Sequence, residues 1–219
     1  MSQQLGIQDR KEQPVFFTDM TFGPIKVDIT RRRQKRISVR PTAAGGLHVQ
    51  APLHMDAADI EAFMQGNKDT IHAWIRRSWE PLISGNTRLW GQITSLEELL
   101  GHVPETPAQL QEELLPVLEQ ELRGKLDCAL GRAVLATGIE PAYVGIRTMS
   151  SRWGSCTPAT RRIRVSTWLA AYPPKCLHAI LVHELVHIEE RGHTKRFWEL
   201  VRTFDPNYDQ AVALLDYVR

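Results

Sequence analysis

Apolar and polar residues alternate in three short runs between Phe22 and residue 52. The apolar positions are Ile25, Val27 and Ile29, then Ile37 and Val39, then Leu47, Val49 and Ala51. A period of two is typical of strands with one buried face, and turn residues at 41–46 separate the last two runs. The pattern predicts a small antiparallel β-meander. Residues 1–19 carry scattered charges without a period, so we expect a flexible N-terminal arm there.

The period then changes to that of helices. A helix is expected from Asp56 to Gly66, and a second one from Asn67, as its N-cap, to Pro81. For residues 82–105 the pattern is ambiguous, and we expect a loop with one short helix around Leu96–Leu100.

The strongest helical signal follows. Thr106 and Gln109 have the spacing of a capping box, and Pro107 stands at the first helical position. An apolar residue then recurs at every fourth position, which predicts one continuous buried stripe. The stripe comprises Leu110, Leu114, Leu118, Leu122, Leu126, Leu130 and Val134. Gly138 is a good terminator for this helix.

The last third of the chain combines both patterns. Two strands are expected at 143–149 and 161–167, joined by the segment SRWGSCTPAT, and then helices follow to the C-terminus. Strands, helices and strands in this order predict an α+β fold with a mostly helical C-terminal half. We divide the chain into 1–19, 20–105 and 106–219, and we expect the last two segments to form one compact unit.

Composition changes this picture little. The 219 residues include no stretch of about 20 apolar residues, so we expect no membrane span. The polar N-terminus lacks the apolar core of a secretory signal. Three cysteines are an odd number without a C-x-x-C pair, which favours a reducing, cytoplasmic location. A formal charge of +2 by itself implies no nucleic-acid partner.

The chemistry is concentrated in the sequence His183-Glu184-Leu185-Val186-His187. Residues four apart share one face of a helix, so both imidazoles can bind one zinc ion. Glu184 is then placed to deprotonate the water that the ion activates. H-E-x-x-H also occurs by chance, but two histidines and a glutamate in so apolar a helix are costly to bury without a partner such as a metal.

A catalytic zinc usually has a third protein ligand. We expect His193, because Gly192 can adopt the left-handed conformation that turns the chain back toward the metal. Glu189, Glu190 and Glu199 are the competing candidates. The H-x-x-x-H-x5-H spacing also occurs in metzincins, but Glu190 stands where their glycine is expected and no methionine follows for a Met-turn.

The segment from Ser151 to Cys156, SRWGSC, followed by a strand and then by HELVHIEERGHTKRFW, resembles the YgjP-like metallopeptidase family. That family is similar in its metal site to the SprT-like and WLM proteases. The resemblance implies a zincin-like catalytic core, a zinc ion on His183, His187 and His193, and a peptide or protein substrate.

The role of SRWGSC stays open at this stage. One possibility is that Arg152 stabilises the oxyanion that develops on the scissile carbonyl. The other is that Arg152 has a structural role, packing on the helix and orienting a side chain that binds the metal. Tyr208 is a second, weaker candidate for the oxyanion. Cys156 is a candidate fourth metal contact, although a small buried residue is the simpler interpretation.

The basic run at 31–36, RRRQKR, is compatible with nucleic-acid phosphate. We expect a solvated hairpin tip instead, because no aromatic platform accompanies it. The rival functions are therefore a metal-dependent nuclease or a DNA-associated protease that uses this run, and a protein in which zinc is only structural. Glu184 argues against the nuclease, because the ribonuclease family with this histidine spacing has glycine at that place. The sequence does not indicate the oligomeric state.

Overall fold

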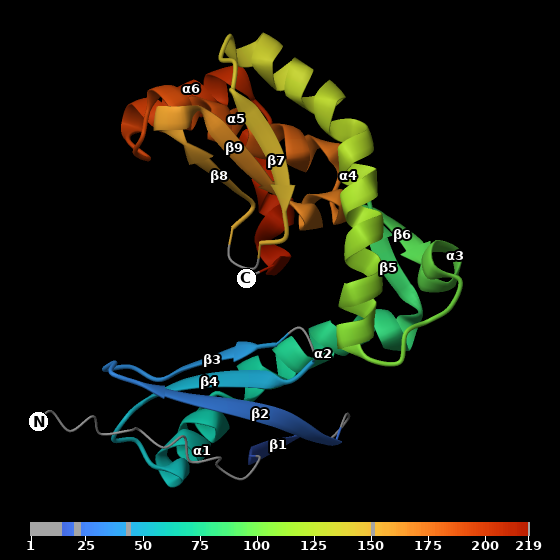
Figure 1. The fold of residues 1–219 in the computed structure, drawn as a ribbon, viewed down its shortest axis with the longest axis vertical. Coiled ribbons are helices and arrows are strands. Elements are labelled where there is room, and N and C mark those ends of the chain that lie inside the picture. The colour runs from blue at the N-terminus through green and yellow to red at the C-terminus, as the bar shows by residue number, and fades with distance from the viewer. Residues whose placement is uncertain (1–14, 20–22, 43–44, 150–151, 219) are drawn as a thin grey trace, which may run out of the picture. The chain divides into compact units, whose positions relative to one another are not determined.

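The computed structural model describes residues 15–19, 23–42, 45–149 and 152–218 (Figure 1). The chain divides into two compact units. The first extends to residue 80 and includes 106–108, and the second comprises 81–105 and 109–219. Residues 81–105 thus pack with the C-terminal part, whereas the sequence pattern grouped them with the N-terminal part. Within the described ranges, none of the helices combines the length and the apolar composition that crossing a bilayer requires.

The first unit contains a four-stranded sheet in the order β1-β2-β4-β3. Its strands are β1 (Val15–Asp19), β2 (Gly23–Arg32), β3 (Ser38–Pro41) and β4 (Leu47–Pro52). β4 lies between β2 and β3 and pairs in parallel with β2, so the prediction of an antiparallel meander was wrong. Alternation identifies the buried face of a strand, but it does not identify the strand's neighbours.

Two details of this sheet correct further expectations. β1 occupies 15–19, which was expected to be part of a flexible arm, while residues 1–14 lie outside the described residues. The basic run 31–36 comprises the last two residues of β2 and most of the connection to β3, and these strands are not neighbours, so the run is not a hairpin tip. The Gln34 carboxamide donates to the Arg36 and Gln50 carbonyls and fixes this connection.

Helices α1 (Ala57–Gly66) and α2 (Lys68–Ser84) follow the sheet. The Asp56 carboxylate caps α1 by accepting from the Asp59 N–H at 2.8 Å. Asn67 does not cap α2 with its side chain as expected, because its carboxamide donates to the Phe63 carbonyl of α1. The core combines apolar residues of both helices and of β2 and β4, namely Ile25, Val27, Leu47, Val49, Ala51, Ile60, Met64, Ile71 and Ile75.

The second unit includes a hairpin that the sequence did not predict, formed by β5 (Asn86–Leu89) and β6 (Gln92–Ser95). Its two-residue turn has positive φ at both Trp90 and Gly91, 52° and 82°. That conformation suits tight hairpins, but it is normally signalled by Asn-Gly or Asp-Gly. With Trp90 in the first turn position, the sequence therefore carries no usual signal for this turn. The short helix α3 (Leu96–Leu100) follows where it was expected.

The long helix α4 (Pro107–Thr137) continues through Pro116 and is followed by Gly138 with φ of 70°. Its leucine stripe is buried from Leu110 to Leu126. The stripe packs into a core shared with the following sheet and helices. The expected helix and its boundaries are thus confirmed.

The elements that build the site begin with a three-stranded sheet in the order β7-β9-β8. β7 (Tyr143–Arg147) pairs in parallel with β9 (Arg162–Ser166), and β8 (Gly154–Thr157) pairs with β9 on its other side in antiparallel orientation. β8 lies inside the segment that was expected only to join two strands. Its short, polar sequence carries no alternation of apolar residues.

Three helices complete the unit, α5 (Pro174–Glu189), α6 (Lys195–Phe204) and α7 (Tyr208–Val212). α5 is the central helix, and most of its apolar side chains are buried. It contacts β8 and β9 as well as α6 and α7. The overall class is the mixed α+β arrangement that was expected.

Candidate metal centre

Three imidazoles converge at the C-terminal end of α5. His183 and His187 lie one turn apart on this helix, and His193 follows the end of the helix. One ring nitrogen of each lies within 4.8 Å of the other two. The Nε2 atoms of His183 and His193 are 3.1 Å apart. The structure therefore brings together the three residues that the sequence selected.

The chain returns to the site by a different route from the one expected. α5 ends at Glu189, and the next residue, Glu190, is extended with φ of −121° and ψ of 102°. Gly192 is not among the glycines with positive φ, so the expected left-handed turn there was wrong. An extended residue directly after the helix already redirects the chain. Thr194 then caps α6 by accepting from the Phe197 N–H at 3.2 Å.

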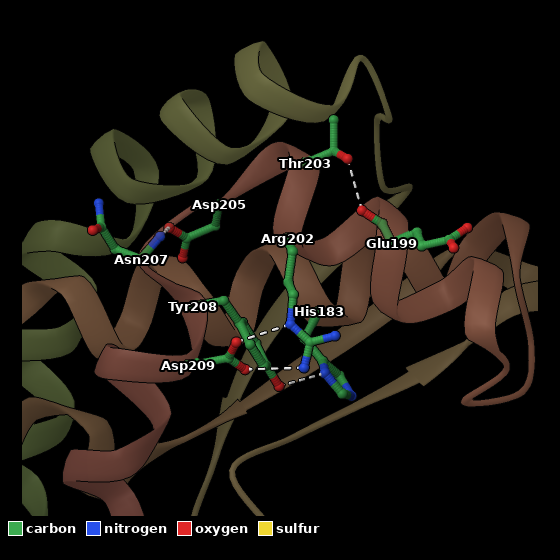
Figure 2. A network of polar contacts seen from close by, with 8 residues as sticks. All are labelled: His183, Glu199, Arg202, Thr203, Asp205, Asn207, Tyr208 and Asp209. Atoms are coloured by element: carbon green, nitrogen blue, oxygen red, sulfur yellow. Dashed lines mark hydrogen bonds and ion pairs between the residues drawn. The ribbon is translucent and has the colours of Figure 1, made fainter.

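The outer nitrogens of two histidines are engaged in hydrogen bonds. His183 Nδ1 lies 2.9 Å from the Tyr208 hydroxyl (Figure 2), and His187 Nδ1 lies 3.1 Å from the Glu190 carbonyl oxygen. A carbonyl only accepts, so His187 donates from Nδ1 and keeps its Nε2 lone pair free. Such bonds from the outer nitrogen fix ring orientation and tautomer in metal sites.

Aromatic rings surround the three histidines. The Phe197 ring is fully buried, and its centroid lies 4.9, 4.4 and 4.8 Å from those of His183, His187 and His193. Trp198 stacks on His193 at 5.4 Å. These contacts restrict the rotamers of the imidazoles, so that they hold their mutual positions. Sequence reasoning related neither aromatic residue to the site.

One ion pair and two hydrogen bonds of Asp205 tie the helix that carries Tyr208 to α6 (Figure 2). The Arg202 guanidinium donates to both carboxylate oxygens of Asp209, at 2.8 and 3.3 Å. The buried Asp205 accepts from the Asn207 N–H at 3.0 Å, and the Asp205 carbonyl accepts from the Tyr208 N–H. Tyr208 is thereby held in register with His183.

Glu184 is 5% exposed and lies against β8. A Cβ atom added at Gly154 would be 2.5 Å from Glu184 Oε1, so only glycine leaves room for this carboxylate. Burial raises the pKa of Glu184 to about 8, against a lowering influence of the Arg152 charge. The function of the glycine in SRWGSC is therefore to accommodate the glutamate of the H-E-x-x-H sequence.

His183 and His187 are held in the neutral form in this environment. Burial, reinforced by the charges of His187 and His193, lowers the pKa of His183 to about 3. Burial likewise lowers the pKa of His187. A cluster of neutral imidazoles is the form that binds a metal ion.

A cavity of about 700 Å³ opens onto the three histidines and Glu184. Its wall includes Arg152, Cys156, Arg191 and Tyr208. Arg152 is exposed there, whereas Tyr208 is buried and bonded to His183. The two residues expected to stabilise an oxyanion thus both border the cavity, but they occupy different environments.

The other residues considered as metal ligands do not belong to the group of converging side chains. Among the described residues, the histidine triad is the one group of three or more side chains arranged to hold a metal ion. Glu199 pairs with Lys195 at 3.5 Å, and Glu190 contributes its backbone carbonyl to His187. Burial, followed by the charge of Glu184, raises the pKa of Cys156 to about 11, which favours the thiol.

Comparison with known proteins finds relatives for the part of the chain that carries this site. The family model described as YgjP-like, metallopeptidase domain, matches residues 81–217. A UTP pyrophosphatase of Escherichia coli (strain K12) is 38% identical over 68 residues, which cover 31% of this chain and 41% of that protein. The chain therefore spans well under half the length of this curated relative.

Two solved structures show weaker similarity. The metallopeptidase zymogen of Pyrococcus abyssi abylysin is 22% identical with a TM-score of 0.36, and covers 41% of this chain and 88% of its own. The metallopeptidase zymogen of Methanocaldococcus jannaschii jannalysin is 19% identical with a TM-score of 0.38, and covers 42% and 88%. Both TM-scores are too low to establish a shared fold.

Proposed function

The chain belongs to the YgjP-like metallopeptidase family, and we propose that it hydrolyses peptide bonds with a zinc ion held by His183, His187 and His193. The observation that carries the proposal is the convergence of three imidazoles beside a buried glutamate, at the wall of a cavity. Three free cysteines, Cys128, Cys156 and Cys176, support the reducing cytoplasm as its location.

The donor set fits zinc. Three imidazole nitrogens with one open position are typical of catalytic zinc sites, and the outer nitrogens of His183 and His187 already have partners. When bound, the ion supplies Lewis-acid polarisation of the scissile carbonyl and lowers the pKa of a water molecule.

Glu184 is the proposed general base. It takes a proton from the attacking water and passes it to the leaving amine. Its burial raises the pKa to about 8, close to neutrality, which suits a group that must both accept and release a proton. Gly154 leaves the room that the Glu184 carboxylate needs to lie against β8.

The remaining two residues take distinct roles. Arg152 is exposed on the cavity wall, where its guanidinium can stabilise the negative charge that develops on the substrate carbonyl. Tyr208 acts through His183, because its hydroxyl is engaged with His183 Nδ1. We therefore assign Tyr208 to positioning the metal ligand rather than to the oxyanion.

A second candidate function is hydrolysis of a pyrophosphate bond in a nucleoside triphosphate. The relative named UTP pyrophosphatase favours it, and so do two arginines, Arg152 and Arg191, in the cavity wall. A guanidinium binds phosphate oxygens as readily as it binds a carbonyl oxyanion. The same histidines and Glu184 can serve either reaction, so substrate assays must separate the two.

The test incubates the zinc-loaded chain with a mixed library of unstructured peptides and, separately, with UTP. We expect new peptide termini by mass spectrometry, and at least a roughly hundredfold lower rate in Glu184→Gln. Glu189→Gln, an exposed glutamate near the end of the same helix, is the matched control and should retain activity. Glu184-dependent cleavage of UTP without peptide cleavage would overturn the peptidase proposal in favour of the second candidate.

A further inference from the structure

The outer face of the three-stranded sheet in the second unit carries a row of arginines. The register pairs Tyr143 with Arg162, Gly145 with Arg164 and Arg147 with Ser166. Side chains two residues apart share a face, so Arg162, Arg164 and Arg147 occupy three successive levels. Successive levels are roughly 7 Å apart along the strands.

This face is the reverse of the one that borders the metal centre. In β9, Ile163 and Val165 are buried, whereas Arg162 and Arg164 are exposed. In β8, Gly154 faces Glu184 and pairs with Val165, on the buried side of the sheet. The arginine row is therefore separate from the site described above.

The row lines a cleft of about 520 Å³, and α4 contributes Glu119 and Arg123 to its lining. Glu119 forms an ion pair with Arg123 of the same helix. Within the part of the chain that the structure describes, no carboxylate pairs with Arg147, Arg162 or Arg164. Among the described residues, these three positive charges in one cleft thus have no carboxylate as a partner.

An aromatic ring accompanies these charges. Tyr143 is 52% exposed, and its ring lies over Gly145, where an added Cβ would be 2.8 Å from Tyr143 Cε1. The Arg162 guanidinium lies 4.7 Å from the centre of the same ring. Arginines that follow a phosphate backbone beside an exposed aromatic ring are the usual composition of sites for single-stranded nucleic acid.

We propose that this cleft, lined by Arg147, Arg162, Arg164 and Tyr143, binds the phosphate backbone of single-stranded nucleic acid. The repeat of the arginines resembles that of successive phosphates in an extended strand, and the guanidinium fork matches phosphate oxygens. The cleft has the volume of a small-molecule pocket, so a duplex does not fit inside it. An acidic peptide would satisfy the charges but would make no use of the aromatic ring.

The test measures binding of fluorescein-labelled 12-nucleotide oligo-U and oligo-dT by anisotropy, over a range of salt concentrations. The full chain in a Glu184→Gln background prevents turnover from interfering. Three phosphate contacts on a single strand predict a slope of log affinity against log salt of about −2. The triple variant Arg147→Gln, Arg162→Gln, Arg164→Gln should lose at least tenfold in affinity and most of that slope. The RNA and DNA probes identify which sugar the cleft prefers.

Three controls make the result specific. The first is a charge-matched triple variant, Arg88→Gln, Arg132→Gln, Lys175→Gln, at exposed positions of this unit outside the cleft. Its affinity for the oligonucleotides should stay within about threefold of the unsubstituted chain. Replacing all three cleft arginines by lysine keeps the charge and should keep the salt slope. Neutralising Arg32, Arg33 and Lys35 tests the other basic segment and should leave most of the affinity.

Several outcomes would overturn the proposal. Among the variants, they are unchanged binding in the cleft triple variant, loss of binding in the charge-matched control, and complete loss when the 32–35 segment is neutralised. Among the ligands, they are equally tight binding of a labelled polyglutamate peptide or of duplex DNA. Because all variants carry an inactive metal site, failure here leaves the proposed hydrolase function untouched.

Discussion

The Tyr208 hydroxyl lies 2.9 Å from Nδ1 of His183, although 25 residues separate them in the chain. The two rings are nearly parallel, with 13° between their planes. The bond leaves His183 Nε2 free, and this atom lies 3.1 Å from His193 Nε2. Tyr208 thus orients one of the three proposed metal ligands, and its distance along the chain hides this relationship from sequence reasoning.

Replacing Tyr208 by Phe tests this role. The variant removes the hydroxyl and leaves His183 Nδ1 without its partner, so we expect a 10- to 100-fold loss in zinc affinity, of the order usual for such outer bonds. Competition with a chromogenic chelator measures it. Unchanged zinc affinity combined with a large loss in kcat would contradict the positioning role and return Tyr208 to the oxyanion.

Gly154→Ala tests the contact between β8 and the glutamate. The added methyl group would lie 2.5 Å from Glu184 Oε1, so the carboxylate must move. We expect at least a roughly tenfold loss in kcat, because a small displacement of a catalytic group is costly. Zinc content should be unchanged, since no histidine is touched. Gly131→Ala, on α4 where an added Cβ meets nothing within 4 Å, is the matched control.

The buried carboxyl of Glu184 predicts a pH-dependent stability difference in chelator-treated protein. Its pKa is raised from 4.5 to about 8 on folding, so its contribution is fully present below pH 4.5 and is lost as pH rises through 8. Glu184→Gln removes that loss. The variant should therefore exceed wild type in free energy of unfolding by on the order of 2–4 kcal/mol at pH 9, with little difference near pH 5.

Urea unfolding at a series of pH values measures this difference directly. Other titrations cancel when the two proteins are compared at the same pH. Parallel stability curves for wild type and Glu184→Gln would show that the carboxyl is not held in a low-dielectric site.

The leucine stripe of α4 supplies a test of the core. Leu122 is fully buried, so Leu122→Ala should lower the free energy of unfolding by about 2–5 kcal/mol. Leu135 on the same helix is 87% exposed, and Leu135→Ala should change it by less than about 0.5 kcal/mol. Equal effects of the two substitutions in urea unfolding would contradict the burial pattern.

Some elements of this fold leave a clear pattern in the sequence, and others do not. Periodicity located α4 and α5, because a long buried stripe leaves a pattern that few other structures produce. It failed for β8 and for the β5–β6 hairpin, where four-residue strands are too short for alternation and Trp90 occupies an unusual turn position. The pairing of β2 with β4 depends on contacts between strands, and local sequence does not encode it.

The residues of the candidate site were likewise only partly predictable from the sequence. The proposed ligands His183 and His187 were predictable because helical spacing alone places them together. The contacts of Tyr208 and Gly154 were not, since they join α7 to α5 and β8 to α5 across the fold. The glycine in SRWGSC was the available signal for the second contact, but the sequence does not say which side chain it must accommodate.

The most direct test of the account is the zinc content of three purified proteins, measured by elemental analysis after loading and removal of excess metal. We predict about one zinc per chain in wild type and in Glu184→Gln, and almost none in His193→Ala. That result would establish the three-histidine ligand set and leave Glu184 free for proton transfer. A wild-type protein that retains no zinc after loading would contradict the central claim.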